Sequence, residues 1–235
     1  MLKRLYLRDV GDEYTGDSRR VRTGLLYRSS GINRLRADER NQLRELRLRH
    51  IIDLREPAIA ARWPDPIIAE TATQLPVGMG ILETVKVGDV LRRRVDFHKL
   101  AHSGLYADVL ESNADSVRRF FNSLLDHPTP ALVHCTAGKD RTGMLVSVLY
   151  AALGVPRQRI IDSYMAIMPH LEQHFPSTIK WLVRAFDGPP LAYSVIPHYI
   201  ERMLDCIEEK HGGADGYFQS IGFGRLDSLR AMFLG

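Results

Sequence analysis

The 235-residue sequence contains only two cysteines, at positions 135 and 206, and no hydrophobic run that approaches the length of a membrane span. Two cysteines so far apart do not make a disulfide framework, so we expect the thiols to work in a reducing compartment. The sequence starts Met-Leu-Lys-Arg-Leu-Tyr and runs directly into charged residues, without the apolar core of a signal peptide. The sequence therefore predicts a cytoplasmic protein without a transmembrane segment, with export in the absence of a signal peptide left open.

The sequence also lacks a polar linker that would separate two comparable halves of the chain. Hydrophobic residues make up 45% of the sequence, which is enough to bury one sizeable core. We therefore expect residues 1–235 to fold as a single domain.

The nine histidines show no metal-ligand spacing. His98 and His102 stand four residues apart, but no glutamate lies between them and no third partner follows nearby. We interpret both as surface or packing residues, and we expect the protein to need no metal and no other cofactor.

The chain is basic, with a net charge of +4 at pH 7 and a pI near 9.1, which suits phosphorylated or otherwise anionic partners. Arginines cluster between positions 34 and 49, where they alternate with Glu39 and Glu45 in a helical pattern typical of a solvated face. Because no nucleic-acid-binding motif and no interleaving of aromatic and basic residues is present, nucleic acid is not expected as a partner.

The most informative stretch is 134–143, which reads His-Cys-Thr-Ala-Gly-Lys-Asp-Arg-Thr-Gly. A short apolar run at 131–133 predicts a buried strand before it, and the apolar run at 144–153 predicts a buried helix after it. A tight turn between the two leaves backbone N–H groups pointing into a concavity at the helix N-terminus. Such a cradle favours an anion of phosphate size, bound here by the loop residues Thr136, Ala137, Gly138 and Lys139.

Cys135 is expected at the strand end beneath this cradle, near the positive end of the helix dipole and the guanidinium of Arg141. Both fields favour the thiolate over the thiol, which makes Cys135 the candidate nucleophile. Arg141 offers a planar fork that binds two phosphate oxygens at once, a geometry that lysine cannot reproduce. The hydroxyl of Thr142 is expected to donate a hydrogen bond toward the sulfur and to stabilise it as a leaving group.

Other interpretations of this stretch are weaker. An inert buried cysteine does not account for the histidine, glycines and arginine at fixed offsets from it. A nucleotide-binding P-loop requires Ser or Thr after Lys139, where the sequence has Asp140. It also requires a glycine five residues before Gly138, where the sequence has Val133. A redox pair would need a second cysteine close to the first.

Strand-like runs at 24–28, 50–54, 73–76 and 131–135 are separated in part by helical patterns, and the chain after Arg141 is almost wholly helical in pattern. This order predicts an α/β fold with a small central, mostly parallel sheet and a helical C-terminal half. A nucleophile at the carboxyl end of a strand agrees with the usual place of sites in such sheets.

At 134–143 the chain resembles the bacterial tyrosine-phosphatase family of cysteine-dependent phosphatases, whose loop reads His-Cys-x-x-Gly-Lys-Asp-Arg-Thr-Gly. Further stretches similar to that family lie at 8–11, 24–29, 52–55, 217–218 and 226–234. The family has Asn-Phe before its Arg-Asp, whereas this chain has Tyr6-Leu7. We expect that departure to affect N-terminal packing and to leave the chemistry unchanged.

The resemblance implies a tyrosine-phosphatase-like fold and an enzyme that hydrolyses phosphotyrosine through a phosphocysteine intermediate. Phosphoserine and phosphothreonine are further substrates of some members, and several members act on phosphoinositides, so both alternatives stay open. The expected partner is a phosphoprotein or a phosphoinositide, and the expected active-site anion is inorganic phosphate or vanadate. A phosphate-binding module without activity would lack a catalytic residue, and none is missing.

Three aspartates compete to protonate the leaving oxygen. The resemblance favours Asp140, because an acid inside the loop reaches the leaving oxygen without a mobile flap. Asp65 ends a Trp-Pro-Asp sequence that spells the acid loop of eukaryotic tyrosine phosphatases, but it lies much farther from the cysteine than that loop does, and we interpret the match as chance. Asp53, at the end of a strand, is expected to hold loop backbone or Arg55.

Two neighbours of the cysteine have supporting roles. Lys139 is expected to add positive charge at the pocket rim, where a second phosphate of an inositol ring would bind. His134 is expected to shape the surroundings of the cysteine without transferring protons. Phosphocysteine chemistry relies on a thiolate, an arginine and backbone donors, which gives a further reason to expect no metal.

Residues 77–115 form an irregular stretch that is far longer than a simple connection of about five residues. In relatives an insertion at this place forms a helical lid, so the resemblance implies a mobile cover over the pocket. An ordinary packed insertion is the alternative.

Overall fold

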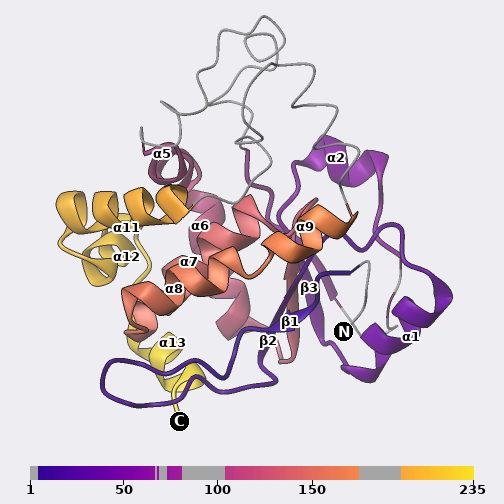
Figure 1. Cartoon of the computed structure of the whole chain (residues 1–235), viewed down its shortest axis with the longest axis horizontal. Helices are drawn as coiled ribbons and strands as arrows, with labels where there is room; N and C mark the ends of the chain where they lie inside the picture. The colour runs from indigo at the N-terminus through magenta and orange to yellow at the C-terminus, as the bar shows by residue number, and fades with distance from the viewer. Residues whose placement is uncertain (1–4, 67, 69–72, 81–103, 175–196) are drawn as a thin grey trace, which may run out of the picture.

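The computed structural model describes residues 5–66, 68, 73–80, 104–174 and 197–235. Its strands form one sheet in the order β1-β2-β5-β3-β4 (Figure 1). Neighbouring strands are parallel, except that β1 runs antiparallel to β2. The strands are β1 (Arg8–Asp9), β2 (Leu26–Ser29), β3 (His50–Asp53), β4 (Thr73–Pro76) and β5 (Ala131–His134).

The described helices surround this sheet. Figure 1 shows α1 and α2 on one side of it and most helices of the C-terminal half on the other, with α9 in front of the strands. In the described part of the chain no helix is both long and apolar enough to cross a membrane. The helices are α1 (Ala37–Glu45), α2 (Pro57–Arg62), α5 (Leu105–Ser112), α6 (Ala114–Asp126), α7 (Asp140–Leu153), α8 (Arg157–Met165), α9 (Met168–His174), α11 (Pro197–His211), α12 (Ala214–Ser220) and α13 (Leu226–Phe233).

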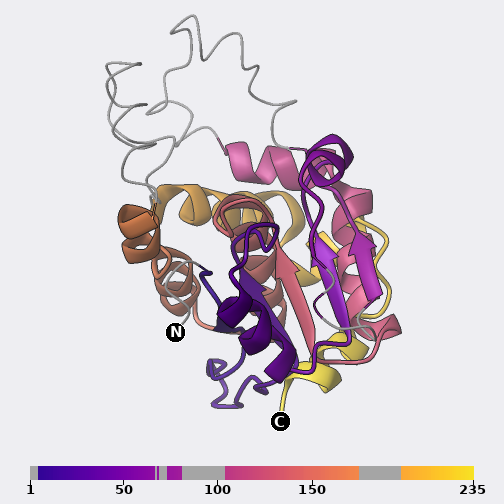
Figure 2. The same cartoon turned by 90° about the vertical axis from the view of Figure 1, so that its right-hand side faces the viewer.

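Strand β5 runs through the middle of the sheet and is buried along its whole length (Figure 2). Alternate side chains of a strand point to opposite faces, and here Val133 joins the large core beneath the C-terminal helices. Leu132 faces the smaller cluster that includes Leu43 of α1. Both faces of the sheet are therefore covered, as a mostly parallel sheet requires.

Helix α7 connects the sheet to the helical half of the chain. Its end follows from Gly154, whose φ of +80° is a left-handed conformation that favours glycine. Inside the helix Gly143 would ordinarily be destabilising, but a Cβ there would lie 2.8 Å from the ring of Tyr164. The glycine therefore allows α8 to pack closely against the first turn of α7.

The predicted α/β fold, with a mostly parallel sheet and a helical second half, is confirmed. The predicted range 73–76 matches β4, and the ends of β2, β3 and β5 lie within one or two residues of the predicted ranges. Strand β5 stops at His134, so that Cys135 is the first loop residue. Strand β1 was not predicted because its two residues are too short for an alternating pattern.

The described ends of the predicted 77–115 insertion are packed against the domain. Val77 and Met79 are buried, and Gly80 exchanges two hydrogen bonds with the side chain of Asn113, at 2.9 and 3.0 Å. Helix α5, which the sequence did not predict, packs against α6 and α11. The central residues 81–103 lie outside the described part, so the mobile lid stays a prediction.

Candidate active site

The loop between β5 and α7 is fixed by both neighbouring strands. The register places Ser29 of β2 and Asp53 of β3 directly beside His134. Beyond the strand ends, Gly31 donates its N–H to the carbonyl of Thr136 at 3.0 Å. The connections after β2 and β3 therefore flank the loop that the sequence singled out, at the carboxyl edge of the sheet.

Cys135 lies at the bottom of this loop with 4% of its surface exposed. The backbone N–H of Gly138 points at its sulfur, with 3.2 Å between the nitrogen and Sγ. Because α7 begins at Asp140, its positive end lies at the same loop. A backbone donor and a helix N-terminus thus converge on the sulfur, and both stabilise negative charge.

Thr142 is placed differently from the prediction. Its hydroxyl is fully buried and makes no hydrogen bond with the described residues, so the expected bond to the Cys135 sulfur is absent here. The Gly138 N–H is the donor that the sulfur has instead. A role for Thr142 when sulfur leaves phosphorus stays a prediction.

Gly138 gives the loop its shape. Its φ is +71°, and a Cβ at this position would lie 2.6 Å from the carbonyl oxygen of Ser29, a contact that real side chains do not make. The Gly138 carbonyl also accepts a hydrogen bond of 2.9 Å from the buried guanidinium of Arg28. Only glycine therefore satisfies both the backbone conformation and the close approach to β2.

We expect Gly138→Ala to lower kcat/KM on para-nitrophenyl phosphate about 100-fold or more, because the displaced loop loses backbone donors to phosphate. Vanadate affinity, measured by inhibition, should fall with it. Gly154→Ala is the matched control, since Gly154 also has a positive φ but no atom within 4 Å of its added Cβ. The control should lose about 1 kcal/mol of stability and keep its activity. Wild-type vanadate affinity in Gly138→Ala would contradict the assignment.

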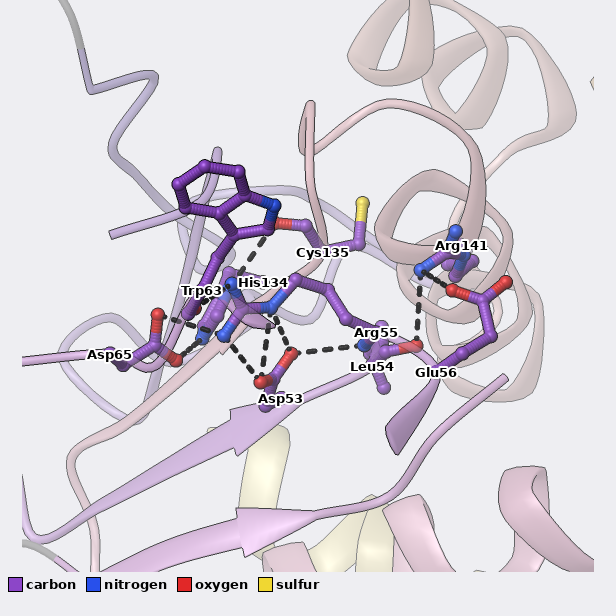
Figure 3. Close-up of polar contacts among 9 residues, drawn as sticks. All are labelled: Asp53, Leu54, Arg55, Glu56, Trp63, Asp65, His134, Cys135 and Arg141. Carbon is purple, nitrogen blue, oxygen red and sulfur yellow. Dashed lines mark hydrogen bonds and ion pairs between the residues drawn. The ribbon is translucent and has the colours of Figure 1, made fainter. Parts of the chain in front are cut away.

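Arg141 is held at the side of the loop by the connection after β3. Its Nη1 lies 3.1 Å from Oε2 of Glu56 and donates a 3.4 Å hydrogen bond to the Leu54 carbonyl (Figure 3). The side chain is 12% exposed, so the guanidinium is largely removed from solvent. Glu56 was not predicted, although its position directly after the family-like segment at 52–55 was a signal that the sequence offered.

Asp140 is the accessible acid of the loop, with 34% of its side chain exposed. It accepts a short hydrogen bond from the hydroxyl of Tyr106, which is 2.8 Å from the hydroxyl of Tyr164. Burial, with the negative charge of Asp140, raises the pKa of both tyrosines well above their usual value. Both phenols therefore stay protonated, so Tyr164 donates to Tyr106 and Tyr106 donates to Asp140.

The two tyrosines come from helices far from the loop in sequence. Tyr106 belongs to α5 and Tyr164 to α8, and Tyr106 also stacks on Tyr199 of α11 with 4.9 Å between ring centroids. Helix α5, packed against α8 and α11 through these rings, therefore helps to fix the position of Asp140. Neither tyrosine was predicted, because no local pattern indicates which residues of distant helices meet.

Lys139 does not project to the rim as the sequence predicted. Its side chain is only 5% exposed, and its Nζ lies 3.2 Å from Oδ1 of Asp140. The lysine therefore places its positive charge beside the loop acid. Thr136 is the exposed residue of the loop, and Ala137 is half-buried.

Asp65 lies against His134, which the sequence did not predict. Its Oδ2 is 2.9 Å from Nε2 of His134, and its Oδ1 is 3.0 Å from Nη2 of Arg55 (Figure 3). The other ring nitrogen of His134 lies 3.3 Å from the carbonyl oxygen of Cys135. Only 4% of the Asp65 side chain is exposed, and its two oxygens lie against Arg55 and His134, so this carboxylate supports the loop.

Asp53 makes the contacts that its position suggested. Its carboxylate accepts hydrogen bonds from the backbone N–H of Arg55 at 2.9 Å and from the guanidinium at 2.7 Å. Burial acts to raise the pKa of Asp53, but the hydrogen bonds from Arg55 and the nearby His134 outweigh it and lower the pKa below its usual value. Asp53 is therefore charged at neutral pH, and its contacts are those of the supporting residue that the sequence predicted.

Asp53, Asp65 and His134 place one potential metal-ligand atom each within 4.8 Å of one another. The guanidinium of Arg55 contacts both carboxylates, at 2.7 and 3.0 Å, so their negative charge already meets a cation of the protein. We interpret this cluster as the rigid support beneath the cysteine loop.

A recessed cysteine, a loop amide directed at its sulfur and a fixed arginine are the groups that a cysteine-based phosphate-binding site requires. Residues 6–235 match the Tyrosine phosphatase family, and the chain belongs to that family. It is therefore a hydrolase of the tyrosine-phosphatase class, which confirms the predicted resemblance.

The chain is similar to named members of this class. It is 25% identical to the Triple specificity protein phosphatase PtpB of Mycobacterium tuberculosis, over 97% of this chain and 96% of that protein. It is 27% identical to the Tyrosine-protein phosphatase of Nostoc commune, over 83% of this chain and 68% of that protein. The solved core catalytic domain of the PP-IP phosphatase Siw14 from S. cerevisiae matches 83% of this chain and 91% of that chain, with 19% identity and a TM-score of 0.33.

Proposed function

We propose that this protein hydrolyses phosphotyrosine monoesters through a phosphocysteine intermediate at Cys135. In the first half-reaction the sulfur forms a bond to phosphorus while the bond from phosphorus to the tyrosyl oxygen breaks. Asp140 gives its proton to that leaving oxygen. Arg141 and the loop amides hold the oxygens of the transferring phosphoryl group, where negative charge accumulates.

In the second half-reaction water attacks phosphorus and the bond to sulfur breaks. Asp140, now a carboxylate, accepts a proton from the attacking water, and inorganic phosphate leaves with the sulfur restored as thiolate. The buried hydroxyl of Thr142 is available to donate to the departing sulfur, because no described residue uses it. Neither half-reaction calls for a metal or a redox cofactor.

The recessed position of Cys135 carries the proposal. The sulfur lies at the bottom of the loop with 4% exposure, and the donor N–H of Gly138 is 3.2 Å from it. A phosphoryl group on a long aryl side chain reaches such a nucleophile more easily than one on a short seryl side chain. The relative named a triple specificity protein phosphatase supports including phosphoserine and phosphothreonine as slower substrates.

Phosphate release from a substrate panel tests this proposal. We expect phosphotyrosyl peptides to be hydrolysed at least about tenfold faster, in kcat/KM, than phosphoseryl or phosphothreonyl peptides or a phosphoinositide. Cys135→Ser should release no phosphate from any of them. Cys206→Ser, which changes the other buried cysteine, is the matched control and should retain wild-type rates. Activity retained in Cys135→Ser, or a phosphoinositide as the fastest substrate, would contradict the proposal.

A further inference from the structure

A cleft of about 660 Å³ opens beside the cysteine loop. One wall is the connection between β2 and α1, with Gly31, Asn33 and Arg34, and the opposite wall is formed by Ile59 of α2 and by Trp63, which follows that helix directly. Thr136, the residue after Cys135, is also part of its lining. The volume is in the range of ligand sites, and the cleft shares Thr136 with the cysteine loop.

The α2 wall exposes apolar surface. Trp63 is 43% exposed and Ile59 is 38% exposed, and both rank among the most exposed large hydrophobic side chains of the described residues. They stand one helical turn apart on the same side of the cleft, where the N–H of Trp63 donates to the Ile59 carbonyl at 3.0 Å. Adjacent exposed apolar side chains at the edge of an active site indicate a surface that binds another molecule.

Trp63 is also held in place, which a merely solvent-exposed side chain would not be. Its carbonyl accepts a 2.8 Å hydrogen bond from Arg55, the arginine that the buried Asp53 and Asp65 fix beneath the loop. From the opposite wall the guanidinium of Arg34 lies 4.7 Å from the centre of the Trp63 ring system. A rigid aromatic surface binds a partner with little loss of side-chain entropy.

The charges of the cleft favour a peptide over a polyphosphorylated inositol ring as its ligand. Arg55 already faces two carboxylates, and the buried Glu39 adds a negative charge to the lining. Among the described lining residues, Arg34 is then the remaining cation that could balance further phosphates. One guanidinium supplies far less positive charge than a polyphosphorylated inositol ring needs. The amides of Asn33 and Gln173 instead offer donors and acceptors suited to a peptide backbone.

We propose that this cleft binds the residues that flank phosphotyrosine in a protein substrate, with an apolar side chain packed on Trp63 and Ile59. The inference rests on the proposed function and adds the substrate class and its preferred neighbour. The phosphoryl group occupies the Cys135 loop, and the peptide continues across Thr136 between the two walls. Figure 3 shows Cys135 with the indole of Trp63 on one side and Arg141 on the other.

Steady-state kinetics with matched substrates test the cleft. The substrates are two phosphotyrosyl peptides that differ only in leucine or aspartate beside the phosphotyrosine, together with para-nitrophenyl phosphate and a phosphoinositide. We expect Trp63→Ala to lower kcat/KM on the leucine peptide about tenfold and Ile59→Ala about threefold. The loss on this peptide should exceed the loss on para-nitrophenyl phosphate at least about fivefold, because the small substrate does not reach the cleft.

Tyr14→Ala is the control variant, because Tyr14 is an exposed aromatic residue beside the opposite end of α7, where Gly16 hydrogen-bonds to Gly154. It should match wild type on every substrate. If Trp63→Ala lowers kcat/KM equally on all substrates, or does not lower it on the leucine peptide, the proposed role of the cleft is wrong. The proposal is also wrong if Trp63→Ala lowers kcat/KM on the phosphoinositide alone, because the cleft would then bind a lipid headgroup. If wild type cleaves para-nitrophenyl phosphate but neither peptide, the proposed function itself fails.

Discussion

Replacement of Arg141 with lysine is expected to lower kcat/KM on para-nitrophenyl phosphate about 10³-fold, although the positive charge is kept. The guanidinium is fixed by Glu56 at 3.1 Å and by the Leu54 carbonyl, so it has little freedom to reorient before a phosphoryl group binds. An ammonium group cannot bind two phosphate oxygens in one plane, and the lost contacts strengthen in the transition state. Steady-state kinetics and vanadate inhibition measure the effect.

Arg157→Lys is the control for this variant. Arg157 forms an exposed ion pair of 2.7 Å with Asp205, and such surface pairs contribute little. Its activity and stability should stay close to wild type. If kcat/KM of Arg141→Lys lies within tenfold of wild type, positive charge alone is sufficient at this position. That result would contradict the bidentate role of Arg141.

Asp140→Asn is expected to lower kcat about 10²-fold to 10³-fold on phenyl phosphate, whose leaving oxygen needs a proton. The decrease in kcat should be smaller on an aryl phosphate whose leaving group is stable as an anion. Asparagine keeps the shape and can still accept the hydrogen bond from Tyr106, so stability should change little. The measurement compares kcat of the variant and wild type over a series of aryl phosphates whose leaving phenols increase in pKa.

Asp65→Asn is the informative comparison for the same substrates. Asp65 is buried between Arg55 and His134, so loss of its charge should lower the free energy of unfolding by about 1 to 3 kcal/mol. Its kcat should depend much less on the leaving group than that of Asp140→Asn. The assignment of the acid is wrong if Asp65→Asn is the more damaged variant on phenyl phosphate while remaining fully folded.

The cysteine loop could be located from the sequence because its signals are local. The apolar runs on either side of Cys135 predict the strand and the helix, and Gly138 marks the turn whose φ proves to be positive. The fold class follows from the same local patterns. Strand ends could be placed only within a residue or two, because side-chain alternation does not determine where a strand stops.

The partners of the loop residues could not be found in this way. Glu56 reaches Arg141 because β3 and β5 are neighbours in the sheet, and Tyr106 reaches Asp140 because α5 packs against α11 and α6. Such contacts depend on the topology of the fold, which local patterns in one sequence do not specify. The direction of a long side chain is equally undetermined, and Lys139 accordingly turns toward the acid and away from the rim.

Covalent phosphorylation of Cys135 is the step on which the whole proposed reaction depends. It can be observed by mixing the enzyme with a phosphotyrosyl peptide, quenching with acid within one turnover, and mapping the phosphoryl group by mass spectrometry. We predict one phosphoryl group on Cys135 and none on Cys206, with a larger phosphorylated fraction in Thr142→Val because the second step is slowed. Phosphate release at the wild-type rate while Cys135 is never phosphorylated would contradict the account.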